Sequence, residues 1–342
     1  MPEHWVIRLP GFSRIVTPEP WRRVGAILLL SLVVLGVSLA VGRVPLSLSQ
    51  LGVALTTPTS ENGLIVIQLR LPRALLGALV GGALGMSGWL FQQVMRNPLA
   101  SPDIVGVTSG ASAAAVGYFS LLATNWGMAW LPLAAILGAL STAFAIYLLA
   151  WQRGVAPLRL VLIGIGVSAL LGAVTTFILV ASPLTTTLSA YVWLTGSVYA
   201  ANWSEVTALA GWCALLGAAL IPLMRLTLLA PLDDALATGI GVRVQWTRAL
   251  LLVVASMLAG VAVAWGGAFA FVGLVAPHMA RMISRTTGTA QAVMAVLFGA
   301  CMVMLADLLG RTLFLPLDLP AGIFVAAIGA PFFLTLLIRQ RR

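Results

Sequence analysis

Long apolar stretches separated by short polar joints run along almost the whole chain, and most of the joints carry an arginine. A helix needs about twenty apolar residues to cross the hydrocarbon core of a bilayer. Stretches of this length lie near residues 24–42, 74–95, 105–124, 128–151, 157–181, 203–229, 247–266, 268–285, 290–313 and 320–338. The pattern predicts an all-α polytopic membrane protein with about ten transmembrane helices, the eighth of them interrupted by Pro277 and His278.

The positions of the arginines predict how these helices are oriented. Cytoplasmic loops carry an excess of basic residues. With a cytoplasmic amino terminus, ten spans return the carboxy terminus to the same side and 15 of the 19 arginines fall at cytoplasmic ends. We therefore expect residues 1–23 to be a cytoplasmic segment and residues 24–342 a single transmembrane domain. The run from Val24 to Val41 is too long for a cleaved signal peptide, so we interpret it as a retained first helix.

The composition supports a membrane protein and excludes several kinds of catalyst. Hydrophobic residues make up 61% of the chain and charged residues 8%, more apolar surface than a soluble fold can hide. All 19 basic residues are arginines, so the lysine of a P-loop or of a Schiff-base enzyme is missing. We expect a protein that is not an enzyme, with any ATP hydrolysis supplied by another polypeptide.

Potential metal ligands are too sparse to predict a metal or cofactor site. The chain has two histidines, His4 and His278, and two cysteines, Cys213 and Cys301, which we interpret as small buried hydrophobes. The formal charge of +10 comes from arginines scattered over the span ends, unlike the clustered charge of a nucleic-acid-binding surface. No cofactor, metal ion or nucleic acid is therefore expected.

Four arginines fall at expected outer ends, against the positive-inside rule: Arg43, Arg70, Arg73 and Arg311. A single arginine at such a place can extend its side chain to the lipid headgroups. Arg70 and Arg73 stand together at the start of one helix. Two roles remain open for this pair, namely anchoring in lipid and docking of an acidic partner.

Asp307 is the only acidic residue well inside a predicted span, and Arg311 follows it by one helical turn. Side chains four residues apart are neighbours on a helix, so we predict a structural ion pair. The competing interpretation of the chain is a secondary transporter driven by an ion gradient. Such a transporter usually holds several acidic or histidine residues within its bundle, and this chain offers one acid with its own arginine.

Glycines and two long joints are the remaining local signals. Small residues let helices approach closely in lipid, so the glycine-rich span is expected at the centre of the bundle. The glycines are Gly77, Gly81, Gly82, Gly85 and Gly88.

Residues 96–112, with two prolines and several small polar residues, line a path or form an ordinary tight loop. Residues 231–243 predict a short helix outside the bilayer, starting at Asp233 and Asp234 and ending at Gly239 or Gly241. It either meets a partner or remains a free surface helix.

Four segments resemble the signatures of one family. They are NPLASPDIVGV at 97–107, FVGLVAPH at 271–278, ADLLGR at 306–311 and GAPFF at 329–333. In this order they resemble the binding-protein-dependent iron-chelate and cobalamin (FecCD-type) permeases. The resemblance implies the ten-helix permease subunit of a type II ABC importer in the bacterial inner membrane. It also implies a second permease subunit, identical or paralogous, two ATP-binding subunits and a periplasmic substrate-binding protein as partners.

The resemblance implies roles for particular residues. Docking of the binding protein is assigned to Arg70, Arg73 and Arg311. Coupling to the ATPase is assigned to Asp233, Asp234, Ala237, Gly239, Gly241 and Val242. A cytoplasmic gate is assigned to Asn97 and Leu99, and a second gate to Pro157 and Leu158, where the chain lacks the small hydroxyl residues of the cobalamin branch.

The same resemblance implies a class of substrate. Ser101-Pro102-Asp103 and residues 193–197 resemble the ferric citrate and siderophore branch more than the cobalamin branch. We therefore expect an iron chelate of the ferric siderophore or ferric citrate type. A cobalamin or haem importer of the same family is the alternative, and the chain does not reveal the individual chelate.

Overall fold

The computed structural model describes residues 5–9, 12–16, 18–152, 154–227, 234–284 and 288–340. The regular elements in these residues are helices, apart from one antiparallel strand pair, β1 (Trp5–Leu9) and β2 (Phe12–Val16), and an isolated bridge between Trp151 and Val155. The long helices are α1 (Pro18–Ala40), α4 (Leu71–Met95), α8 (Leu131–Leu149), α9 (Pro157–Ala181), α11 (Trp203–Thr227), α13 (Val244–Gly266), α15 (Thr289–Thr312) and α16 (Ala321–Gln340). The shorter ones are α2 (Leu48–Thr56), α3 (Glu61–Leu64), the π-helix η1 (Ile65–Arg70), α5 (Pro102–Val105), α6 (Val107–Leu121), α7 (Ala123–Trp126), the 3-10 helix η2 (Met128–Trp130), α10 (Leu184–Leu194), α12 (Asp234–Gly239) and α14 (Val272–Ile283).

Seven helices in this part of the chain are long and apolar enough to cross a membrane, fewer than the ten expected. The all-helical class is confirmed, but two predicted spans form shorter helices. The span at 105–124 becomes α6, of 15 residues, because the chain turns at Gly106 with φ +94°. The span at 268–285 becomes α14, of 12 residues, because Gly267 and Phe271 adopt positive φ and delay its start. The predicted span at 320–338 corresponds to α16, of 20 residues.

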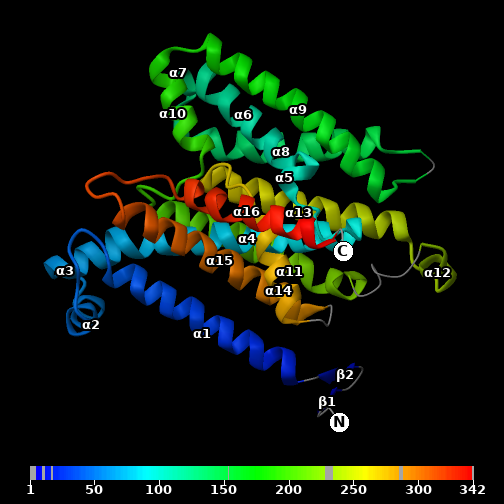
Figure 1. The fold of residues 1–342 in the computed structure, drawn as a ribbon, viewed down its shortest axis with the longest axis horizontal. Helices are drawn as coiled ribbons and strands as arrows, with labels where there is room; N and C mark the ends of the chain where they lie inside the picture. Colours follow the sequence, from blue (N-terminus) through cyan, green and yellow to red (C-terminus); the bar gives the residue numbers. More distant parts are fainter. Residues whose placement is uncertain are drawn as a thin grey trace.

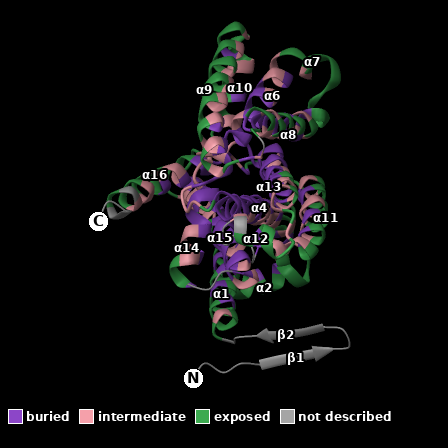
Figure 2. Ribbon diagram, turned by 90° about the vertical axis from the view of Figure 1, so that its right-hand side faces the viewer, coloured by how far each residue is buried: buried purple, intermediate pink, exposed green. Residues whose placement is uncertain are grey.

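Helix α4 lies at the centre of the bundle and α9 lies at its edge. In the most apolar stretch of the continuous helix Glu61–Met95, which includes α4, 78% of the residues are buried. In the most apolar stretch of α9 only 11% are buried, and Figure 2 shows the same contrast. A Cβ atom on Gly81 would lie 2.1 Å from the carbonyl oxygen of Gly299 in α15, and one on Gly88 would lie 1.7 Å from that of Gly273. The predicted packing role of the glycine-rich helix is confirmed, because only glycine permits these backbone contacts.

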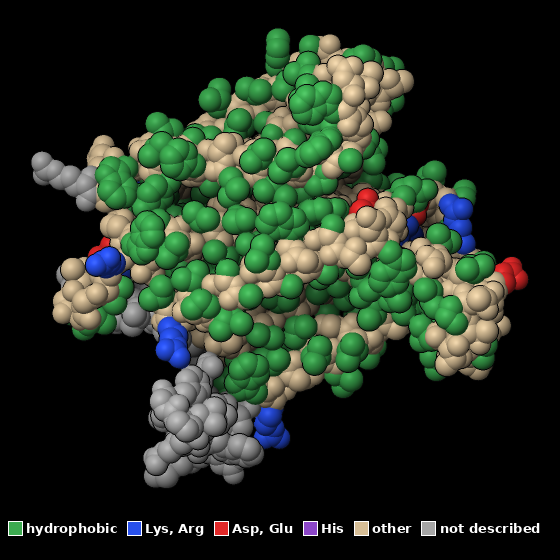
Figure 3. Space-filling model, turned by 180° about the vertical axis from the view of Figure 1, so that it is seen from behind, with side chains coloured by type: hydrophobic (Ala, Val, Ile, Leu, Met, Phe, Trp, Pro, Cys, Tyr) green, Lys and Arg blue, Asp and Glu red, His purple; other side chains and the backbone are tan. Residues whose placement is uncertain are grey.

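The bundle has two polar ends, which we call the Arg73 end and the Asp234 end. In Figure 1 the Arg73 end, with α2 and α3, is on the left, and the Asp234 end, with α12, is on the right. Helices α6 to α10 form an upper layer over α4, α13 and α15, while α1 lies below and α16 in front. Helix α1 begins and α16 ends toward the Asp234 end. Figure 3 shows hydrophobic side chains across the middle of one face, with charged side chains gathered toward the ends.

Some elements were not expected from the pattern. Helix α1 begins at Pro18, so the predicted domain boundary between residues 23 and 24 falls inside this helix. The strands β1 and β2 pair antiparallel, with Trp5 opposite Val16. Helix α10 occupies a stretch between two predicted spans, where threonines and a serine interrupt the apolar pattern.

Candidate functional site at the two polar ends

Arg73 forms the centre of an ion-pair network at one end of the bundle. Its Nε donates to both carboxylate oxygens of Asp307, at 2.8 and 3.0 Å. Its Nη1 and Nη2 donate to the two oxygens of Asp318, at 2.7 and 2.8 Å. The guanidinium also stands 5.6 Å from the ring centre of Tyr199. Since bidentate arginine–carboxylate pairs are strong and directional, Arg73 fixes α4 to the end of α15 and to the loop that follows it.

Arg311 has a weaker link to Asp307 than Arg73 has. The Nε of Arg311 lies 3.7 Å from a carboxylate oxygen of Asp307, and this buried Nε makes no hydrogen bond within the described residues. The Nη2 of Arg311 instead donates to the hydroxyl of Ser38 at 2.9 Å and to the carbonyl oxygen of the same residue. The predicted pair is therefore present only as a long contact, and the main partner of Asp307 comes from α4.

Arg70 caps the end of α1. Its guanidinium donates to the carbonyl oxygens of Leu39, at 2.7 Å, and Ala40, at 3.0 Å, and to that of Val44. The last carbonyl groups of a helix have no partner within the helix, so a buried arginine satisfies them. The side chains of Arg70, Arg73 and Arg311 are thus mostly buried and already paired within this chain.

Asp234 joins three helices at the other end of the bundle. It accepts a hydrogen bond from Arg96 at 2.6 Å and from Arg248 at 3.2 Å. Burial raises the pKa of Asp234, but the charges of Arg248 and Arg96 and their hydrogen bonds outweigh this effect and lower it below its ordinary value. The carboxylate is therefore charged at neutral pH and links α12 to the end of α4 and the start of α13.

The geometry of Asp234 follows from two local turns. Helix α4 ends at Arg96, which has the left-handed φ of +49° and turns its side chain toward α12. Helix α12 ends in a Schellman motif, in which Val242 N donates to Ala237 O at 3.0 Å and Gly241 N donates to Thr238 O at 2.9 Å. Gly241 has φ +87°, as this motif requires.

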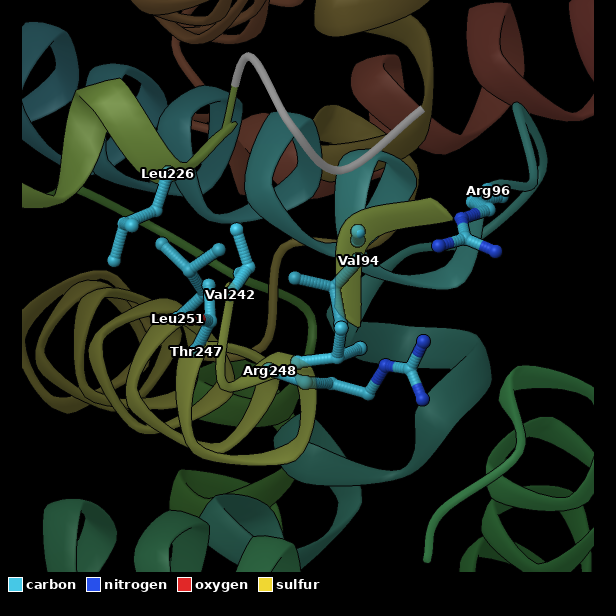
Figure 4. A pocket seen from close by; sticks show the side chains of 9 residues that line it. Val94, Arg96, Leu226, Val242, Thr247, Arg248 and Leu251 are labelled. Carbon is cyan, nitrogen blue, oxygen red and sulfur yellow. The ribbon is translucent and has the colours of Figure 1, made fainter. Parts of the chain in front are cut away.

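The predicted short helix is confirmed in part. Its expected first residue, Asp233, lies outside the described residues, and the described helix runs Asp234–Gly239. A hollow lies between α12 and the bundle, with Arg96 and Arg248 on one side in Figure 4 and Leu226, Val242 and Leu251 on the other.

Arg248 continues the network toward the start of α9. Its side chain is only 5% exposed, and besides Asp234 it donates to the carbonyl oxygen of Val155. The backbone N–H of Val155 donates to the side chain of Gln245 at 3.0 Å, so α13 holds this residue by both of its backbone groups. Two residues later Pro157 begins α9, followed by Leu158, which is 71% exposed. The sequence did not identify Arg248 as a site residue. The positive-inside rule already accounts for an arginine at this span end, so nothing set it apart from the other arginines.

The two longest signature segments meet inside the bundle. The carboxylate of Asp103 accepts a hydrogen bond from the backbone N–H of Phe271 at 3.2 Å, just before α14 begins. A Cβ atom on Gly273 would lie 2.9 Å from Pro102. Beside this junction, Asn97 and Leu99 form a local turn in which Leu99 N donates to Asn97 Oδ1 at 2.9 Å. The predicted gate residues Asn97 and Leu99 thus precede a tightly packed corner.

The chain is similar to known membrane permeases over almost its full length. The FecCD transport family matches residues 28–339. The Achromobactin transport system permease protein CbrC of Dickeya dadantii (strain 3937) is 60% identical over 337 residues, which cover 98% of this chain and 97% of that protein. The Fe(3+) dicitrate transport system permease protein FecD of Escherichia coli (strain K12) is 39% identical over 294 residues, covering 82% and 87%.

A solved structure shares the fold. It is described as an inward-facing conformation of a metal-chelate type ABC transporter, and it matches with a TM-score of 0.82 at 28% identity. The match covers 93% of this chain and 99% of that one. The apolar helices and these relatives together indicate a membrane protein.

Proposed function

The chain belongs to the FecCD transport family, and we propose that it is the permease subunit of a binding-protein-dependent ABC importer for an iron chelate. The cargo is a ferric siderophore or a chelate of the ferric citrate type, carried across the bacterial inner membrane. The observation that carries this proposal is 60% identity along nearly the whole chain to an achromobactin permease. The ferric dicitrate permease, at 39% identity, supports the same class of cargo.

ATP-binding subunits are proposed to dock at the Asp234 end, which we place in the cytoplasm together with both termini. Leu236 of α12 and Ile240 in the turn that follows it are large apolar side chains, each about two-thirds exposed. Exposed apolar groups on a short helix outside the apolar band fit a partner surface. The coupling residues of this proposal are Asp234, Ala237 and Gly239 of α12, Gly241 and Val242 of its cap, and Asp233, which lies outside the described residues.

The contacts of Asp234 and Arg248 supply a route for coupling. A movement of α12, driven by ATP binding and hydrolysis in the partner subunits, would reach Arg248 through its ion pair with Asp234. Arg248 is buried and holds the carbonyl oxygen of Val155, so the same movement would reach the start of α9 at Pro157 and Leu158. We propose these two residues, with Asn97 and Leu99, as the gate region of the permeation path.

A second permease subunit, identical or paralogous, is proposed to cover α9 and α16. Helix α9 is largely unburied within this chain, and Leu158, Leu162 and Ile165 are among its exposed apolar residues. Lipid also covers apolar helices, so exposure alone does not define the interface. A path between two copies would explain why polar and small residues of the signature segments lie beside α9.

The binding protein is proposed to dock at the Arg73 end, with Arg70, Arg73 and Arg311 as the basic groups. The structure adds a condition to this prediction, because these arginines already have partners within the chain. An acidic partner has to compete with Asp318 for Arg73, and Asp318 is the more exposed of its two carboxylates. Charge complementarity would then govern the rate and orientation of docking more than its affinity.

The proposed function is tested by isolating the tagged chain with its partners and assaying transport. We expect mass analysis to identify two ATP-binding subunits and either a second copy or a paralogue of this chain. The complex should then take up ferric chelates of the siderophore or citrate class when ATP and the binding protein are present. Uptake of cobalamin or haem in preference to every ferric chelate tested would contradict the proposed cargo.

A further inference from the structure

A large cavity at the Arg73 end has no role in the proposed path. It has a volume of about 760 Å³ and lies where α8, α10 and α11 meet, with further walls from α4 and the end of α13. Its lining is rich in aromatic side chains, which are Phe119, Trp130, Trp193, Tyr199, Trp212 and Trp265. The cavity separates part of the upper layer of helices from the central body, so an occupant would contact both.

Glu205 is the single charged residue among those that line the cavity. It lies in the first turn of α11, where its backbone N–H donates to the side chain of Asn202 at 3.1 Å. One carboxylate oxygen of Glu205 accepts from the backbone N–H of Asn202 at 3.3 Å. These reciprocal bonds form a capping box. Within the described residues the other carboxylate oxygen has no hydrogen-bond partner, so it is available to a ligand.

The tryptophan rings and one carboxylate together favour a cation, whereas the ring of Tyr199 already carries the guanidinium of Arg73. Ammonium groups bind over the faces of tryptophan, because the ring quadrupole is negative there. A nearby carboxylate adds charge attraction and disfavours an anionic ligand. The chain carries nineteen arginines and nine acids, so a cation-selective cavity runs against the overall charge of the protein.

The position of the cavity indicates where the cation comes from. Helix α11 is one of the seven helices that are long and apolar enough to span a membrane, and Glu205 stands at its first turn, where a span meets the lipid headgroups. The buried part of the lining contains apolar side chains such as Leu76 and Ile136, which suit an acyl chain. We propose that this cavity binds a phospholipid with a primary ammonium headgroup, held by Glu205 and the surrounding aromatic rings.

Native mass spectrometry of the delipidated full-length chain, after addition of defined lipids, tests the proposal. Ethanolamine phospholipid is compared with glycerol phospholipid of the same acyl chains. The variant Glu205→Gln removes the charge but keeps the capping box, because glutamine also serves at this position. We expect it to weaken binding of the ethanolamine lipid by up to about fivefold, the range of a partly exposed ion pair. The control Glu61→Gln alters an exposed acid of α3 and should leave binding unchanged.

Three further results decide the source and the place of binding. Ala208→Trp fills the cavity and should reduce ethanolamine lipid binding while glycerol lipid binding elsewhere stays the same. Free ethanolamine should compete poorly, since it lacks the acyl chain; equal competition would replace the lipid with a soluble amine as the ligand. Equal affinity for both lipids in the unaltered chain, or no change in Glu205→Gln, would overturn the proposal and leave Glu205 as a helix cap.

Discussion

The two polar ends of the bundle use the same kinds of residue in different ways. At the Arg73 end, one arginine binds two carboxylates from α15 and the loop after it, and its side chain is 12% exposed. At the Asp234 end, one carboxylate binds two arginines from α4 and α13, and its side chain is 43% exposed. The first arrangement is a buried clamp within the bundle. The second attaches a short, accessible helix to the bundle through few contacts.

This difference indicates what each end can do. A buried charge network resists change, because breaking one pair leaves another charge without water or a partner. Opening an ion pair of a half-exposed carboxylate costs less free energy, since water replaces the lost partner. The Asp234 end is therefore suited to transmit a movement from outside the bundle. The Arg73 end is suited to hold α1, α4 and α15 together while the other end moves.

The largest expected effect is loss of stability on changing Asp307 to alanine. This change leaves Arg73 and Arg311 buried without their shared carboxylate, which typically costs about 3–5 kcal/mol. Thermal unfolding of the purified chain in detergent measures the effect. An unchanged unfolding midpoint would contradict the interpretation of the Arg73 end as a clamp.

A second effect is expected at the other end, on transport more than on stability. Asp234→Asn weakens the link between α12 and Arg248, so less chelate should be transported for each ATP hydrolysed. Changes along a coupling route typically alter coupling by about 0.5–2 kcal/mol, or roughly 2- to 30-fold.

The matched control for this experiment is Glu19→Gln. Glu19 is an exposed acid at the start of α1 that pairs with Arg23, one turn away on the same helix. It should leave the ratio of transport to hydrolysis unchanged, because it does not touch α12. If Asp234→Asn behaves as this control does, the proposed coupling route is wrong.

A smaller effect is expected on docking at the Arg73 end. Asp318→Asn removes the competitor for Arg73 while Asp307 keeps the arginine in place. Affinity for the binding protein should rise by up to about fivefold, the range of partly exposed ion pairs. The increase should shrink as salt is added, because the interaction is screened. A decrease in affinity would mean that the binding protein contacts Asp318 and not Arg73.

The smallest effect is a pH dependence of stability that comes from Asp234. The pKa of Asp234 in the folded chain is below its ordinary value of 3.8, so its ion pairs contribute fully above that value. The contribution is lost as the pH falls below about 4 and through the lowered pKa. The difference in unfolding midpoint between the unaltered chain and Asp234→Asn should be constant from pH 8 to pH 5 and shrink below pH 4. A difference that grows in acid would contradict the ion pairs.

Local patterns predicted the parts of the fold that depend on neighbouring residues. The spacing of glycines identified α4 as the central helix, and Gly239 and Gly241 were the two candidates for the end of α12, which ends at Gly239 and turns away at Gly241. Both are properties of a few consecutive turns of chain. Helix length was predicted less well, because Gly106 and Phe271 interrupt apolar stretches with backbone turns that composition does not reveal.

Partners distant in sequence were not predicted. Asp307 accepts its hydrogen bonds from Arg73, which lies 234 residues away, whereas the predicted pair with Arg311 is present only as a contact of 3.7 Å. The bond from Phe271 to Asp103 likewise spans 168 residues. A single sequence contains the charges of such pairs but not the packing that brings them together. The resemblance to a family located the important segments, whereas the contacts between them required the structure.

Uptake of ferric chelate by vesicles containing the assembled complex distinguishes an ATP-driven permease from an ion-coupled transporter. We expect uptake that requires ATP and the binding protein and continues when ion gradients are collapsed by an ionophore. Uptake that stops with the ionophore while ATP remains, or that proceeds with this chain alone, would contradict a permease driven by separate ATPase subunits.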